Sequence, residues 1–274
     1  CIRDSSNIGE VDNKGIELSL NWRKEIIKDL NVDLRANLTY NKNKYVYYDE
    51  PNYEAVWKKK TGQPLSISWG YIADGYFQNQ EEIDNGPDQT GLGSQLKPGD
   101  IKYRDVNGDG IINDDDKVML SSFGSMPRIQ YGLGLNLTYK KIDFGVFFNG
   151  SAQRKIMINN AMTDFGERNN NVMKCIADDH WSIDNPNPEA TFPRLGLKST
   201  DIKNNTEASS HWLRNGNFIR FKTLEVGYSF PHCRVYFSGD NLAVWSPFKL
   251  WDPELSWNTY PLQRTFNFGV QLNF

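Results

Sequence analysis

Apolar and polar side chains alternate strictly over the last ten residues of the chain. One side of the extended backbone carries the apolar set, which is Phe266, Phe268, Val270, Leu272 and Phe274. About ten residues is the length of a tilted strand that crosses a bilayer, and apolar-out, polar-in alternation suits the wall of a water-lined barrel. The pattern therefore predicts a closing strand of an outer-membrane barrel.

The same alternation recurs in six earlier segments. They cover residues 16–22, 32–40, 131–139, 142–148 and 224–230, with a shorter and weaker example at 235–237. Phe147 breaks the alternation in the fourth of these strands. The whole chain is thus expected to be all-β, with antiparallel strands that form a transmembrane barrel.

Short and long connections alternate along the chain. The short ones lie near 24–29, 140–141 and 231–232, and the long ones span about 41–127, 151–217 and 241–264. Outer-membrane barrels have short periplasmic turns and long extracellular loops, whereas a soluble sandwich has no reason to alternate in this way. The C-terminus is therefore expected on the periplasmic side.

Seven strands do not close a bacterial barrel, because single-chain barrels have an even number. An open edge at Gly15 would also leave backbone groups unpaired in lipid. We expect residues 1–274 to be the C-terminal part of a larger barrel, whose plug and earlier strands lie outside this sequence.

Composition narrows the class of protein. No continuous apolar stretch is long enough for a helical membrane protein, while 15 Phe, 13 Tyr and 8 Trp fit a wall that is apolar only at alternate positions. A soluble antiparallel sandwich with one wet face shares this composition. The net charge is −3 and no segment is dense in Lys or Arg, so we expect no nucleic-acid partner. The three cysteines show no metal-ligand spacing.

A calcium-loop pattern lies in the first long connection. Counted from Asp105, oxygen-bearing side chains of Asp105, Asn107, Asp109 and Asp116 fall at positions one, three, five and twelve, and Ile111 supplies a backbone carbonyl at position seven. Gly110 takes the sharp-turn position and Ile112 can anchor the loop. A structural calcium or magnesium ion is the interpretation, and a solvated acidic turn is the alternative, because Asp, Asn and Gly are common turn residues. Asp116 replaces the usual Glu, which favours weaker binding.

No enzyme motif stands out. Neither a Ser-His-Asp order nor an HExxH segment is present, and metal binding accounts for the dense carboxylates, so the chain is not expected to be an enzyme.

Several segments together resemble the SusC/RagA-type TonB-linked outer-membrane transporters. Two of them are Leu96–Ile112 and Pro127–Leu137, and four others follow the family's order at Asn13–Leu20, Gly70–Phe77, Trp212–Leu224 and Val235–Leu242. Each segment is modest, but the ordered set is specific and covers essentially the whole chain.

The resemblance implies a 22-stranded barrel filled by an N-terminal plug, in the outer membrane of a Gram-negative bacterium. It further implies a SusD-like surface lipoprotein as lid, energy from the TonB–ExbB–ExbD complex, and import of oligosaccharides or oligopeptides. A passive porin or a surface adhesin would share the barrel pattern and remains the alternative.

The substrate-binding residues are unknown from sequence. Trp22 suits a membrane-interface belt, and the other tryptophans fall in or beside the expected outer loops, where aromatic faces stack on sugars or grip peptides. The simpler interpretation is that they pack the loops together. Those residues are Trp57, Trp69, Trp181, Trp212, Trp245, Trp251 and Trp257.

Overall fold

The computed structural model describes the chain apart from residues 1–6, 54, 94, 160–170, 256–258 and 273–274. The described chain forms two compact units. The sheet unit comprises Asn13–Asn43, Ser125–Arg154 and Asn215–Phe274, and the loop unit comprises Cys1–Asp12, Lys44–Gly124 and Lys155–Arg214.

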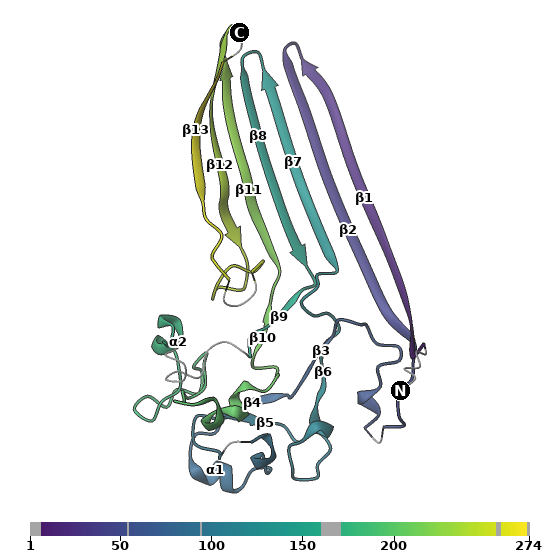
Figure 1. Cartoon of the computed structure of the whole chain (residues 1–274), viewed down its shortest axis with the longest axis vertical. Coiled ribbons are helices and arrows are strands. Elements are labelled where there is room, and N and C mark those ends of the chain that lie inside the picture. The colour runs from purple at the N-terminus through teal and green to yellow at the C-terminus, as the bar shows by residue number, and fades with distance from the viewer. Residues whose placement is uncertain (1–6, 54, 94, 160–170, 256–258, 273–274) are drawn as a thin grey trace, which may run out of the picture. The chain divides into compact units, whose positions relative to one another are not determined.

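A seven-stranded antiparallel sheet has the order β1-β2-β7-β8-β11-β12-β13 (Figure 1). The order of these strands across the sheet follows their order along the chain. The strands are β1 (Gly9–Ile27), β2 (Leu30–Tyr48), β7 (Ile129–Tyr139), β8 (Ile142–Ala152), β11 (Phe218–Ser229), β12 (Cys233–Trp245) and β13 (Thr265–Leu272). All seven strands expected from the sequence are present, and the connections between consecutive strands of the sheet are alternately short and long.

Register places every second residue on the same face. Leu34 pairs with Leu135, and Leu135 pairs with Val146, so the apolar side chains of neighbouring strands stack on one face. The adjacent row joins Asp33, Asn136 and Gly145 on the other face. One face of the sheet is consequently apolar and the other polar across its width.

Several of the strands are longer than the sequence pattern predicts. β1 and β2 extend through mostly polar residues, because backbone pairing continues where neither face is apolar and alternation no longer marks the strand. β12, expected only at 235–237, has 13 residues. Gly239 interrupts the alternation of β12 because it has no side chain. The side chain of Leu242 occupies the space instead, and a Cβ added at Gly239 would lie 2.7 Å from it.

A bulge hides the first half of β11. The register shifts between Phe221 and Thr223, so the apolar positions change phase at Lys222. A pattern with a fixed period of two detects the strand only after the bulge, which is why the prediction began at Leu224.

Phe147 lies on the polar face, where it covers two glycines of β7. An added Cβ would lie 3.2 Å from its ring at Gly132 and 3.4 Å at Gly134. The break in alternation is therefore a local packing feature, with an aromatic ring filling space that two glycines leave open.

The loop unit has a core of its own. Its fully buried side chains include Tyr71, Phe77, Ile101, Tyr103 and Trp212. Its short elements were not predicted: β3 (Ser68–Gly70) pairs with β6 (Val118–Ser121), β4 (Ala73–Tyr76) with β5 (Ile101–Tyr103), and β10 (Leu213–Asn215) with β9 (Lys155–Met157). These short pairings depend on contacts between distant segments, which no local pattern reveals.

The helices are short. They are α1 (Gln80–Asp84) and α2 (Lys174–Asp178), with 3-10 turns at Val56–Lys58, Thr90–Leu92, Asp114–Asp116, Ser199–Asp201 and Lys203–Thr206. Across the described ranges, no helix has the length and apolar character to cross a membrane.

Candidate functional site

The acidic loop at 105–116 turns around its first carboxylate. Asp105 accepts hydrogen bonds from the backbone N–H groups of Gly108 through Oδ1 and Gly110 through Oδ2, each at 2.7 Å. Both glycines have positive φ, 78° and 82°, which lets the chain wrap around the carboxylate. These donors, Gly110 first, lower the pKa of Asp105 and keep it charged.

The twelfth position returns to the start of the loop. Asp116 is fully buried, and its carboxylate accepts from the N–H of Val106 at 2.7 Å and of Asn113 at 2.9 Å. Ile112 is also fully buried, as expected of a loop anchor. The structure therefore brings Asp105 and Asp116 to the same turn, 11 positions apart in sequence.

The middle positions bond to each other and to the backbone. Asn107 Nδ2 donates to Asp109 Oδ2 at 2.9 Å, and Asp109 Oδ1 accepts from the N–H of Ile111 at 2.8 Å. Across the described residues, no group of three His, Cys, Asp or Glu side chains converges in metal-binding geometry. The loop has the oxygen-rich donor set that calcium prefers, but its carboxylates here cap backbone N–H groups.

The apolar residues of the terminal strand share one exposed face. Phe266, Phe268, Val270 and Leu272 are 56, 86, 65 and 59% exposed, and β13 pairs with β12 from Thr265 to Leu272. Phe274, the fifth member of the predicted set, lies outside the described residues. Such a continuous apolar face needs a covering medium.

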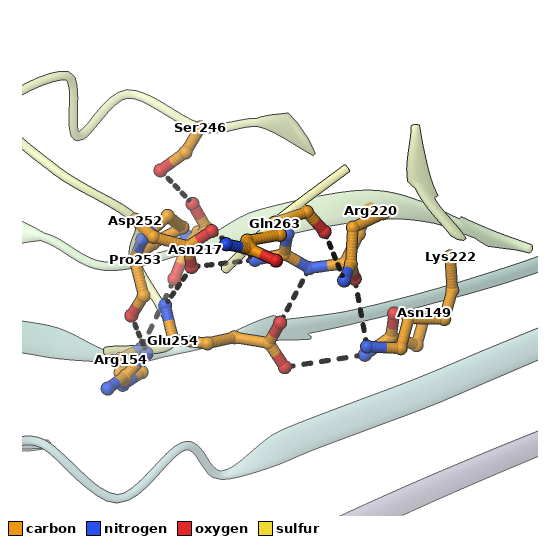
Figure 2. A network of polar contacts seen from close by, with 11 residues as sticks. Asn149, Arg154, Asn217, Arg220, Lys222, Ser246, Asp252, Pro253, Glu254 and Gln263 are labelled. Carbon is orange, nitrogen blue, oxygen red and sulfur yellow. Dashed lines mark hydrogen bonds and ion pairs between the residues drawn. The ribbon is translucent and has the colours of Figure 1, made fainter. Parts of the chain in front are cut away.

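A buried arginine on the polar face was not predicted from the sequence. Arg220 of β11 is 2% exposed and bonds two carboxylates of the β12–β13 connection. Its Nη2 donates to both oxygens of Asp252 at 2.6 and 2.7 Å, and its Nε donates to Glu254 Oε2 at 2.6 Å. Figure 2 shows Glu254 lying between Arg220 and Asn149. The sequence feature that could have indicated this cluster is the arginine at a polar-face position inside a strand.

Further bonds fasten the same connection to the sheet (Figure 2). Arg154 donates to the carbonyl of Pro253, and Ser246 Oγ donates to the carbonyl of Asn217 at 2.7 Å. Phe248 is buried and packs edge-on against Trp251, with ring centroids 4.7 Å apart. The connection after β12 is therefore a fixed structure over residues 246–255.

Tryptophan positions divide between core and surface. Trp181 and Trp212 are buried in the loop unit, as the loop-packing interpretation predicts, and Trp251 packs as described above. Trp57 is 38% exposed and donates from Nε1 to the carbonyl of Asp115 at 3.1 Å, while Trp245 is 52% exposed. Trp257 lies outside the described residues.

Burial lowers the pKa of His211, which lies beside Tyr76 in the loop unit. His211 lies 3.3 Å from the hydroxyl of Tyr76, and burial lowers the pKa of His211 to about 4, with a further contribution from the charge of Arg214. The ring of His211 packs edge-on against Trp212, with ring centroids 4.6 Å apart, which suits a neutral imidazole.

No protein-family model matches the chain. Three curated proteins are similar to it over 98% of its length. They are TonB-dependent receptor P26 and TonB-dependent receptor P3 of Formosa agariphila, at 30% and 26% identity, and TonB-dependent receptor SusC of Bacteroides thetaiotaomicron, at 28%. The chain spans only 27 to 30% of the length of these relatives.

Solved structures share the fold. A structure of the RagAB peptide transporter matches 98% of the chain with a TM-score of 0.66 at 21% identity, and the chain covers 30% of that protein. The "open-open" state of the RagAB peptide importer matches 97% of the chain with the same TM-score. The fold of the chain is thus similar to about 30% of that larger protein.

Proposed function

We propose that this chain, a relative of the SusC/RagA-type TonB-dependent receptors, is part of an outer-membrane barrel that imports oligosaccharides or oligopeptides with energy from TonB. The observation that carries the proposal is the 30% identity to a TonB-dependent receptor along 98% of the chain. The relatives are receptors and transporters, which agrees with a protein that is not an enzyme.

The two faces of the sheet support a place in a barrel wall. The apolar face, ending in the exposed side chains of β13, would contact lipid, and the polar face with Arg220 would line the lumen. The short turns would then be periplasmic and the long connections extracellular, with the C-terminus in the periplasm. This orientation would place the loop unit outside the cell.

Several partners follow from the proposal. The complete transporter would contain a plug and further strands that are not within this sequence. A SusD-like surface lipoprotein would close over the extracellular side, and TonB–ExbB–ExbD would supply energy from the inner membrane.

Uptake measurements test the proposal. Cells that express the full-length protein with its lipoprotein partner are given labelled oligosaccharides or oligopeptides, with and without TonB. We expect uptake to depend on both the transporter gene and TonB. Uptake that persists without TonB would point to a passive porin, and attachment without uptake would point to an adhesin.

We also propose that the acidic loop binds a structural calcium ion, with magnesium as a weaker competitor. Asp105, Asn107, Asp109 and Asp116 would provide side-chain oxygens and Ile111 a backbone carbonyl. Support comes from the positive-φ glycines, the buried anchor at Ile112 and the return of Asp116 to the first turn. The ion would replace backbone N–H groups as partner of these carboxylates.

Terbium luminescence tests the metal proposal, because Trp57 contacts the loop at Asp115 and can sensitise a bound lanthanide. We expect emission that calcium displaces and that Asp105→Asn abolishes. Trp57→Phe is the matched control, since it should remove the emission while calorimetry still detects calcium. Calcium binding by Asp105→Asn equal to that of the natural sequence would contradict the proposal.

A further inference from the structure

Four lysines gather at the end of the sheet where the β1–β2 and β7–β8 turns lie side by side (Figure 1). The two turns are joined by a hydrogen bond from the N–H of Lys140 to the carbonyl of Asp29, at 3.1 Å. All four side chains are exposed, and they are Lys24, Lys28, Lys140 and Lys141. We call this set the lysine rim.

The lysine rim differs from the charged side chains of the polar face, which are paired. Asp33 accepts from Arg23 and Arg35, at 2.5 and 3.1 Å. Arg234 bonds both Asp143 and Glu225. Among the described residues, by contrast, no carboxylate forms an ion pair with any lysine of the rim.

The formal charge of the two turns is positive. Their carboxylates are Glu25 and Asp29, and Glu25 Oε1 accepts from the backbone N–H of Asp29 at 2.9 Å, within its own turn. Four lysines against two carboxylates leave two positive charges. An anion beside the rim is therefore attracted.

A row of apolar side chains crosses the sheet immediately beside the lysine rim. Register aligns Tyr139 with Ile142 and Ile142 with Tyr228, and the ring of Phe230 lies 4.7 Å from that of Tyr228. These four side chains are 39 to 48% exposed. Lys140 Nζ lies 5.2 Å from the ring centroid of Tyr139, so this ammonium group extends over the apolar face.

The end of β1 repeats the combination of apolar and cationic side chains. Trp22, Lys24 and Ile26 occupy alternate positions and so share one face of the strand. Trp22 is 41% exposed and Ile26 is 48% exposed. Aromatic rings beside lysines suit a membrane interface, because the apolar parts enter the hydrocarbon and the ammonium groups reach the headgroups.

We propose that the lysine rim binds the phosphate groups of anionic phospholipids in the periplasmic leaflet of the membrane. Charge complementarity favours an anionic headgroup over a zwitterionic one, which has no net charge to offset the rim. The adjoining aromatic row favours a lipid over a soluble phosphate, because acyl chains cover the exposed rings. The assignment rests on the proposed function, in which the short turns are periplasmic and the apolar face contacts lipid.

Lipid quenching at position 142 tests the assignment. A fluorescent amino acid replaces Ile142 in the full-length transporter, which is reconstituted in phosphatidylcholine vesicles. Dibrominated phosphatidylglycerol or dibrominated phosphatidylcholine is added at equal mole fraction, and the two quenching curves give the relative affinity of the rim for the anionic lipid. Heat-modifiable gel mobility confirms that each variant is folded.

Three double variants locate the effect. Lys140→Asn with Lys141→Gln removes two charges from the rim, and asparagine tolerates the φ of 54° at position 140. Lys140→Arg with Lys141→Arg keeps both charges. Lys42→Gln with Lys44→Gln is the matched control, because it removes two exposed lysines near the other end of β2.

We expect the natural sequence to prefer phosphatidylglycerol by roughly tenfold at low salt, and the neutral rim variant to lose at least about fivefold of that preference. The arginine variant and the control pair should keep it. Equal quenching by the two lipids, or a preference that the neutral rim variant retains, overturns the proposal. Loss of the preference in millimolar inorganic phosphate, but not in sodium chloride of equal ionic strength, would assign the lysines to a free anion and also overturn it.

Failure of this inference is distinguishable from failure of the proposed function. TonB-dependent uptake together with equal quenching by both lipids would reject the lipid site alone. A preference for phosphatidylglycerol that depends on Lys140 and Lys141, together with uptake that does not need TonB, would reject active import and retain the lipid site. Absence of quenching by either lipid would contradict the place of the sheet in a barrel wall.

Discussion

At the scale of single residues, Arg220 joins the sheet to the connection after β12. It is nearly inaccessible to solvent, and the carboxylates of Asp252 and Glu254 are 14% and 32% exposed. Removing one partner from such a cluster leaves the others buried with unbalanced charge, which is more costly than the cluster's own net contribution. Arg220 therefore contributes strongly to the position of residues 252–254.

Replacement of Arg220 by Met should release this connection. We expect cleavage by protease after β12 to be at least tenfold faster, and the stability of the anchored segment to fall by on the order of 3 kcal/mol. Limited proteolysis of the full-length protein in vesicles measures the effect. Arg35→Met, at an exposed arginine of the polar face, is the control. Equal cleavage of both variants would show that Arg220 does not hold the segment.

The buried His211 gives the loop unit a defined pH dependence. Its folded pKa of about 4 lies below the unfolded value of 6.5, so the unfolded chain binds more protons between these limits. Above pH 6.5 the protonation of His211 does not destabilise the folded loop unit. As the pH falls toward 4, the free energy of unfolding decreases by at most about 3 kcal/mol.

Hydrogen exchange of residues 208–213, corrected for intrinsic rates, measures this loss. We expect protection to fall from pH 6.5 to 4.5 and His211→Gln to remove much of that slope. His232→Gln, in an exposed turn, is the control. A slope that is identical in all three proteins would exclude His211 as its source.

At the scale of elements, a close contact of β7, β8 and β11 depends on a glycine. A Cβ at Gly150 would lie 2.5 Å from the carbonyl oxygen of Phe218 and from the hydroxyl of Tyr131. Without that Cβ, Tyr131 donates to the Phe218 carbonyl at 3.0 Å across the strand between them. A backbone atom cannot move aside as a flexible side chain can.

Gly150→Ala should therefore impair assembly of the sheet, whereas Gly134→Ala should be tolerated. The nearest atom to a Cβ at Gly134 is 3.4 Å away, in the ring of Phe147. We expect the heat-modifiable folded band to be reduced severalfold for Gly150→Ala and to be unchanged within error for Gly134→Ala. Equal amounts of folded protein would contradict the close approach at Gly150.

The elements also separate what the sequence predicts from what it does not. Regular alternation identified all seven strands of the sheet, because one face is apolar and the other polar. The bulge at Lys222 and the side-chain gap at Gly239 concealed the limits of β11 and β12. The pairings inside the loop unit and the bonds of Arg220 join residues at least 25 positions apart, so no local pattern could indicate these partners.

At the scale of the whole molecule, the central claim is that the seven-stranded sheet belongs to a barrel wall between lipid and an aqueous lumen. The apolar face and the polar face then contact different media. A soluble sandwich would also alternate, but its apolar face would be sealed within a protein core and its polar face exposed to water. A barrel wall and a soluble sandwich therefore differ in whether lipid reaches the apolar face.

Spin-label accessibility along β13 measures this access most directly. Single labels are placed at positions 266–272 of the full-length protein in lipid vesicles, and collision with lipid-soluble oxygen is compared with collision with a water-soluble nickel complex. We predict oxygen maxima at Phe266, Phe268, Val270 and Leu272, with nickel favoured at the positions between them. Low oxygen access at all four apolar positions, or nickel access without a period of two, would contradict the barrel-wall account.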